Sequence, residues 1–124
     1  LIFHADGNKP VTKDDPAKRD RPLLMYAVGL GVTKGARIVA GEPVPASPPS
    51  VTDPVEVFFG DPRLAQSEVI VDWSGLVPGF VGLYQLQLRV PGFHGRGDAL
   101  PVSVKIGGVS SPTTGANVPI VSVD

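Results

Sequence analysis

Apolar and polar residues alternate most regularly in two segments of the second half of the chain, residues 83–90 and 99–106. A period of two residues is typical of a β-strand that buries one face and exposes the other. The positions assigned to the buried faces are Tyr84, Leu86, Leu88, Val90, Leu100, Val102, Val104 and Ile106. Because only residues 91–98 separate the two segments, the pattern predicts an antiparallel hairpin whose strands pair and share the core.

Shorter apolar segments predict further strands. Residues 23–30 are apolar at nearly every position, which indicates a central strand that is covered on both faces for part of its length. The remaining predicted strands cover residues 2–5, 55–59, 68–73 and 118–123. A proline at position 119 places the last of these at the edge of a sheet.

The fifteen glycines and fourteen prolines fall between these segments, so turns are frequent and helices have little room. About seven to eight strands in a chain of 124 residues favour an all-β fold, namely an immunoglobulin-like antiparallel sandwich of two sheets. The chain is long enough for one domain, residues 1–124. Two long connections lie within it: a charged loop from Lys9 to Pro22, and a proline-rich, extended loop from Gly41 to Pro54.

Four segments also resemble a known family. They are GLG at residues 29–31, PGFVGLYQLQLRVP at 78–91, GDALPV at 97–102 and IGGVSS at 106–111. Together they resemble the immunoglobulin-like C-terminal domain, of uncharacterised activity, that is abundant in exported proteins of Acidobacteria. The chain departs from that family over residues 63–73 and in the charged loop before Pro22. The resemblance implies export and a sandwich fold, and it brings no functional residues.

The charge balance and the absence of cysteine exclude several classes of function. Without cysteine there can be no disulfide, no thiol catalysis and no thiolate metal site. A net charge of −1 provides no field that would attract nucleic acid. No apolar run is long enough to span a membrane. The first residues lack the features of a signal peptide and the chain begins without methionine, so either a leader preceded Leu1 or the sequence is an excerpt of a longer protein. We favour the first alternative. Together with the resemblance to exported proteins, it leads us to expect a protein of the cell surface or the extracellular space, exported by a leader absent from this chain.

Candidate catalytic residues are few. His4 and His94 are the only candidates for a general base near neutral pH, and neither stands in a motif that also supplies a nucleophile. The oxygen-rich segments at residues 6–8 and 14–15 lack the spacing of a calcium loop and are typical of turns. We therefore expect no enzymatic activity, no cofactor and no metal site.

These observations favour a non-catalytic extracellular module that has a structural role or binds other protein domains or copies of itself. Sheet edges are the expected means of assembly into a surface structure. The candidate assembly strand consists of Leu1, Ile2, Phe3, His4 and Ala5. Two alternatives remain open here, since this strand could complete its own sheet or add to the sheet of a neighbouring copy.

The alternative function is a carbohydrate-binding module that contacts polysaccharide through aromatic side chains. The candidate contacts are Trp73, Phe80 and Phe93. A lone tryptophan in a sandwich usually packs in the core. From the sequence we therefore expect Trp73 to be buried and the protein to bind no glycan specifically.

Overall fold

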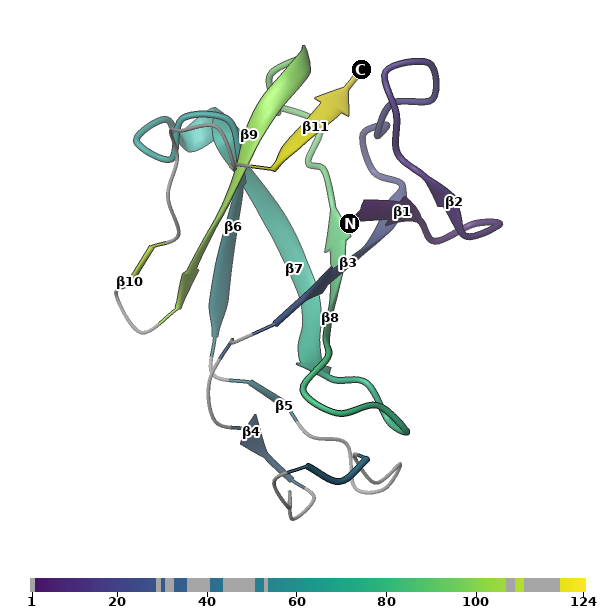
Figure 1. Cartoon of the computed structure of the whole chain (residues 1–124). Helices are drawn as coiled ribbons and strands as arrows, with labels where there is room; N and C mark the ends of the chain where they lie inside the picture. The colour runs from purple at the N-terminus through teal and green to yellow at the C-terminus, as the bar shows by residue number, and fades with distance from the viewer. Residues whose placement is uncertain are drawn as a thin grey trace.

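The computed structural model describes residues 2–28, 30, 33–35, 41–43, 51–52, 54–106, 109–110 and 119–124 (Figure 1). Its strands in chain order are β1 (Ile2–His4), β2 (Lys9–Pro10), β3 (Pro22–Ala27), β4 (Thr33–Lys34), β5 (Val51–Thr52), β6 (Val55–Phe59), β7 (Glu68–Leu76), β8 (Tyr84–Arg89), β9 (Gly97–Ile106), β10 (Val109–Ser110) and β11 (Ile120–Val123). A 3-10 turn, η1 (Ala65–Ser67), precedes β7. The all-β prediction is confirmed, and the described ranges contain no α-helix.

The strands form a continuous antiparallel path in the order β10-β9-β6-β7-β8-β3-β1-β2, and this sheet curls into a half-barrel. Strand β11 adds to β9, β5 adds to β7, and β4 adds to β5. The join between β6 and β7 is short, since only Val57 with Val69 and Phe58 with Glu68 are paired there. Two separate sheets are therefore not confirmed, because one hydrogen-bonded path runs through both halves of the molecule.

The predicted hairpin between residues 83–90 and 99–106 is wrong. Both edges of β8 are occupied, one by β7 and the other by β3. Strand β9 pairs instead with β6 on one edge and with β10 and β11 on the other. The segment between β8 and β9 thus carries the chain across the curl rather than back along its neighbour (Figure 1). Alternation alone could not reveal this, because it fixes which face of a strand is buried and not which strand lies beside it.

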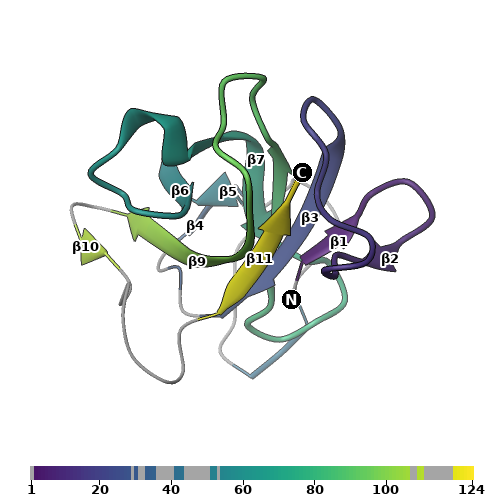
Figure 2. The same cartoon turned by 90° about the horizontal axis from the view of Figure 1, so that it is seen from above.

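Figure 2 shows the curl of the strands from above. The core is built from the inward-facing rows of these strands. Leu86 and Leu88 of β8 are 0% and 1% exposed, as the alternation predicts. Their cross-strand partners on β3 are Met25 and Leu23, which are buried with them. Each such side chain contributes about 1.5–3 kcal/mol by leaving water.

The segment predicted as a charged loop, residues 9–22, contains β2 and closes one side of the curl. Ala17 is fully buried and forms a parallel bridge with Val123 of β11. Its amide donates to the carbonyl of Ser122 at 2.8 Å, and its carbonyl accepts from the amide of Asp124 at 2.9 Å. The amide of Asp20 then donates to the carbonyl of Val90 at 2.7 Å, so the segment ties β11 to the end of β8 before β3 begins.

The proline-rich loop predicted for residues 41–54 lies largely outside the described residues, because 44–50 and 53 are not among them. Its described part includes β5, whose Val51 pairs with Gly75 of β7. In the ranges given above, no helix is long and apolar enough to cross a membrane.

Candidate functional site

A bulge in β7 determines where the single tryptophan lies. Val71 pairs with Leu88 of β8, but the next paired residue on β7 is Trp73, opposite Gln87, so Asp72 is an extra residue in the ladder. One extra residue reverses the alternation of faces beyond it. Val71 therefore packs against the core, whereas Trp73 turns to the outward face and is only half-buried. The expectation that Trp73 packs in the core is wrong for this reason.

Register places Trp73 at one end of a row that crosses four adjacent strands. Trp73 of β7 is opposite Gln87 of β8, which is opposite Leu24 of β3, which is opposite Phe3 of β1. Directly opposed residues of antiparallel strands project from the same face. None of the four is fully buried, so this row forms part of the outward surface of the sheet. We call the surface formed by this row together with Gln85 and Tyr26 the outward face.

Hydrogen bonds and ring packing fix several of these side chains. The Nε2 group of Gln87 donates to Oε1 of Gln85 at 3.3 Å, and Nε2 of Gln85 donates to the hydroxyl of Tyr26 at 3.1 Å. The ring of Tyr26 meets that of Phe3 edge to face, with centroids 6.0 Å apart. The two amides and the phenol therefore form a connected polar chain beside the row, and this chain limits the rotamers that they adopt.

The charges beside the outward face cancel. Arg89, which follows Gln87 on the same side of β8, donates from Nε to Asp72 at 2.7 Å and from Nη2 at 2.9 Å. Hydrogen bonds from this guanidinium hold the pKa of Asp72 below its ordinary value of 3.8, although partial desolvation opposes them. Both side chains are about two-fifths exposed, at 42% and 39%, so the pair orients the bulge more than it stabilises the fold.

We expect Arg89→Gln to raise the pKa of Asp72 towards 3.8, because the variant loses the charged donors of the guanidinium. Ionised Asp72 favours the folded state above its unfolded pKa, and this contribution disappears as the pH falls through the lowered folded value, that is, below about pH 4. Carboxyl carbon shifts recorded against pH measure the change. Asp61, whose pKa Arg63 lowers to about 2 in a distant loop, serves as the control and should not move. An unchanged Asp72 titration would show that the ion pair does not hold in solution.

The three candidate glycan contacts do not meet. Phe80 lies in the loop before β8 and Phe93 in the loop after it, and both are more than half exposed. A strand of this length separates them by about 20 Å. Only Trp73 lies on the outward face. The sequence analysis did not select Tyr26, because it lies in a segment that is apolar at nearly every position. The alternation along β8 had already assigned Gln85 and Gln87 to the solvent side.

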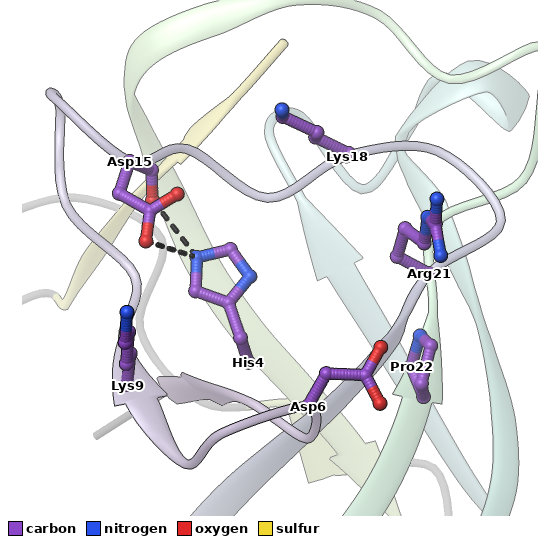
Figure 3. A pocket seen from close by; sticks show the side chains of 7 residues that line it. All are labelled: His4, Asp6, Lys9, Asp15, Lys18, Arg21 and Pro22. Carbon is purple, nitrogen blue, oxygen red and sulfur yellow. Dashed lines mark hydrogen bonds and ion pairs between the residues drawn. The ribbon is translucent and has the colours of Figure 1, made fainter.

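His4 lies in a basin of about 260 Å³ near the N-terminus (Figure 3). Its Nε2 atom is 3.0 Å from the carbonyl oxygen of Asp15 and 3.4 Å from the Oδ2 atom of the same residue. The other residues that line the basin are Asp6, Lys9, Lys18, Arg21 and Pro22. Among the residues that the structure describes, this lining contains a histidine and carboxylates but no serine, threonine or other hydroxyl nucleophile. The contact between His4 and Asp15 therefore holds β1 against the turn at Asp15. The described lining of the basin does not supply the nucleophile of a hydrolytic triad.

His94 is a buried structural residue. It is 2% exposed, and its ring packs edge to face on Phe59 at 6.1 Å. Its Nε2 atom lies 3.2 Å from the carbonyl oxygen of Ser67, and its Nδ1 atom lies 2.6 Å from that of Gly95. Nη2 of Arg19 donates to the carbonyl of His94 at 2.9 Å. His94 therefore links the loop before β7 to the loop after β8, and no ring nitrogen faces solvent.

The candidate assembly strand pairs within its own chain. Phe3 and His4 are opposite Pro10 and Lys9 of β2 on one edge, and residues 2–4 pair with β3 on the other. Ala5 continues the β3 contact through its amide, which donates to Pro22 at 3.1 Å. Leu1 lies outside the described residues. Exchange of this strand between copies would thus require both edges to separate, and it remains a prediction.

No group of three or more histidine, aspartate or glutamate side chains that could hold a metal ion occurs among the described residues. Comparison with protein-family models, with curated proteins and with solved structures finds no match for this chain. The function must therefore be argued from the surface chemistry of the chain itself.

Proposed function

We propose that this chain is a non-catalytic binding module of an exported protein, with an immunoglobulin-like fold, and that it binds through the outward face. The observation that carries the proposal is a set of partly exposed aromatic and amide side chains on four adjacent strands. Hydrogen bonds and one ring contact join those on β8, β3 and β1, and register places Trp73 of β7 beside them. Ordered polar groups and aromatic rings at a surface are typical of recognition sites. The extracellular location rests on the resemblance to a domain of exported proteins.

Strand order supports the immunoglobulin-like assignment. The run β1-β3-β8-β7 and the run β11-β9-β6 follow the arrangement of the two sheets in a constant-type immunoglobulin domain, strand for strand in chain order. The parallel bridge at Ala17 adds the N-terminal segment to β11. In this assignment the β6–β7 pairing is a short bridge between two sheets.

Structural assembly through sheet edges is the weaker form of the proposal. The free edge beside β1 is β2, whose Lys9 and Pro10 are both exposed. Lysine and proline at an edge disfavour the addition of a further strand. The outer edge of β11 is partly occupied by Ala17. A face is therefore the better candidate than an edge for the binding surface.

The absence of catalysis is tested by turnover of ester and glycoside substrates between pH 5 and 8. We expect none above the rate without protein. For esters the reason is that the described lining of the His4 basin has no hydroxyl nucleophile and that His94 is enclosed. Glycoside cleavage needs a pair of carboxyl groups instead, and one of the two in this basin, Asp15, is held by His4. His4→Ala provides the matched variant. Activity that survives purification and disappears in His4→Ala would contradict the proposal.

The binding surface is tested by placing a photoreactive amino acid at position 87, on the outward face, and in a second variant at position 56. Both Gln87 and Glu56 are exposed, but Glu56 lies on β6 in the other half of the curl. We expect covalent adducts in native exported material from position 87 alone. Equal labelling from both positions, or none from position 87, would contradict a role for the outward face.

A further inference from the structure

We infer that the outward face binds a neutral polysaccharide, which lies across the strands along the row Trp73, Gln87, Leu24 and Phe3. This inference rests on the proposed binding role and names its ligand class. It also reverses the expectation from the sequence that no glycan is bound, because that expectation required Trp73 to lie in the core.

The chemistry of the row matches that of a sugar chain. A pyranose ring has an apolar face of C–H groups and a rim of hydroxyls. The half-buried indole of Trp73 and the Phe3–Tyr26 ring pair offer apolar contacts at the two ends of the row. Between them, an amide side chain can donate to one hydroxyl and accept from another. Gln87 is exposed, and within the described part of the chain its Oε1 atom has no protein partner.

The shape of the site favours a chain over a single sugar. The row lies on an open sheet face, whereas a small ligand is usually enclosed by a cavity that buries most of its surface. Four adjacent strands span about three spacings of 4.8 Å, or ~14 Å, so contacts at both ends require an extended ligand. A polysaccharide meets this requirement with repeated weak contacts.

The charges argue for a neutral ligand. Arg89, which flanks the row, is paired with Asp72, so the pair adds no net charge to the face. A polyanion such as a nucleic acid gains its affinity from unpaired lysine and arginine side chains. Most of the exposed large apolar side chains, among them Val28, Phe80, Val81, Phe93 and Ile120, lie outside the row. The exception beside it is Ile70 of β7, opposite Arg89, which is 37% exposed. The row therefore exposes little of the aliphatic surface that usually forms the centre of an interface with another protein.

The test uses the fluorescence of Trp73, the single tryptophan of the chain, so its emission reports on this face without background. The probes are cellohexaose, xylohexaose and mannohexaose, with polygalacturonate as the charged comparison. We expect a saturable change in emission with at least one neutral hexasaccharide and none with polygalacturonate. The absence of binding to all three neutral probes at millimolar concentration would overturn the inference.

Variants locate the site, with calorimetry as the readout and the backbone NMR spectrum as the check on folding. Trp73→Ala should abolish binding, and Trp73→Phe should retain part of it. Gln87→Ala, an exposed substitution that leaves the core intact, should weaken binding about tenfold through the loss of hydrogen bonds to hydroxyls. Phe93→Ala, an exposed aromatic away from the face, is the control and should not change the affinity.

Two outcomes separate this inference from the proposed function. Sugar binding that is equal in the wild type, Trp73→Ala and Gln87→Ala would place the glycan elsewhere and overturn the inference. If no probe binds but position 87 cross-links to a polypeptide, the ligand class is wrong and the binding role of the face stands. If neither a sugar nor an adduct is found at this face, both fail.

Discussion

Leu86→Ala should lower the free energy of unfolding by about 3–4 kcal/mol. Leu86 is 0% exposed and lies in the middle of β8, between Met25 of β3 and Ser74 of β7. Truncation removes its transfer free energy and leaves a cavity that the paired strands on both sides keep from collapsing. Urea titration monitored by Trp73 fluorescence measures the loss.

The matched control is Gln87→Ala, one residue further along the same strand. Gln87 faces solvent, and the hydrogen bond from its side chain to Gln85 is exposed. Its loss should change stability by about 0.5 kcal/mol or less. Equal effects at the two positions would show that the register of β8 is wrong.

His94→Ala should destabilise the fold by about 2–4 kcal/mol. The substitution empties the space beside Phe59 and removes the ring nitrogens that face the carbonyl oxygens of Ser67 and Gly95. The buried carbonyl of Ser67 then loses this partner, and a buried polar group without one costs free energy. The same urea titration measures this change.

The neighbouring Phe93 provides the comparison for His94. It is 66% exposed, so Phe93→Ala should alter stability by about 0.5 kcal/mol or less. The two residues are neighbours in the same loop. The difference between their losses of unfolding free energy therefore reports the burial and hydrogen bonding of His94 rather than its position in the chain. A His94→Ala protein as stable as the wild type would contradict the buried link between the two loops.

The sequence predicts strands better than it predicts their neighbours. Leu86 and Leu88 alternate with glutamines, and the structure places them in the core as that period requires. The continuous apolar pattern of β3 predicts a central strand, and its position between β8 and β1 confirms this. The predicted cover on both faces is not confirmed, because Leu24 and Tyr26 are only half-buried. The hairpin between β8 and β9 was wrong because pairing depends on long-range packing, which a local pattern does not encode.

The candidate site could be predicted only in part for a related reason. Trp73 follows Val69 and Val71 at intervals of two, so a regular strand would turn it inward with them. The extra residue at Asp72 reverses its direction, and nothing local distinguishes that aspartate from any other polar position in a strand. Tyr26 and Phe3 join Trp73 only because strands distant in sequence lie side by side.

Whether the outward face is the binding surface can be measured directly by NMR. The protein is titrated with the neutral hexasaccharide that binds most tightly, and the chemical shifts of its side-chain N–H groups are followed. We predict the largest shifts at the indole N–H of Trp73 and the side-chain amides of Gln85 and Gln87, with no change at Gln66, whose amide lies in the η1 turn. Shifts that leave these groups unchanged and instead follow His4 or the loops around Phe80 and Phe93 would contradict the account.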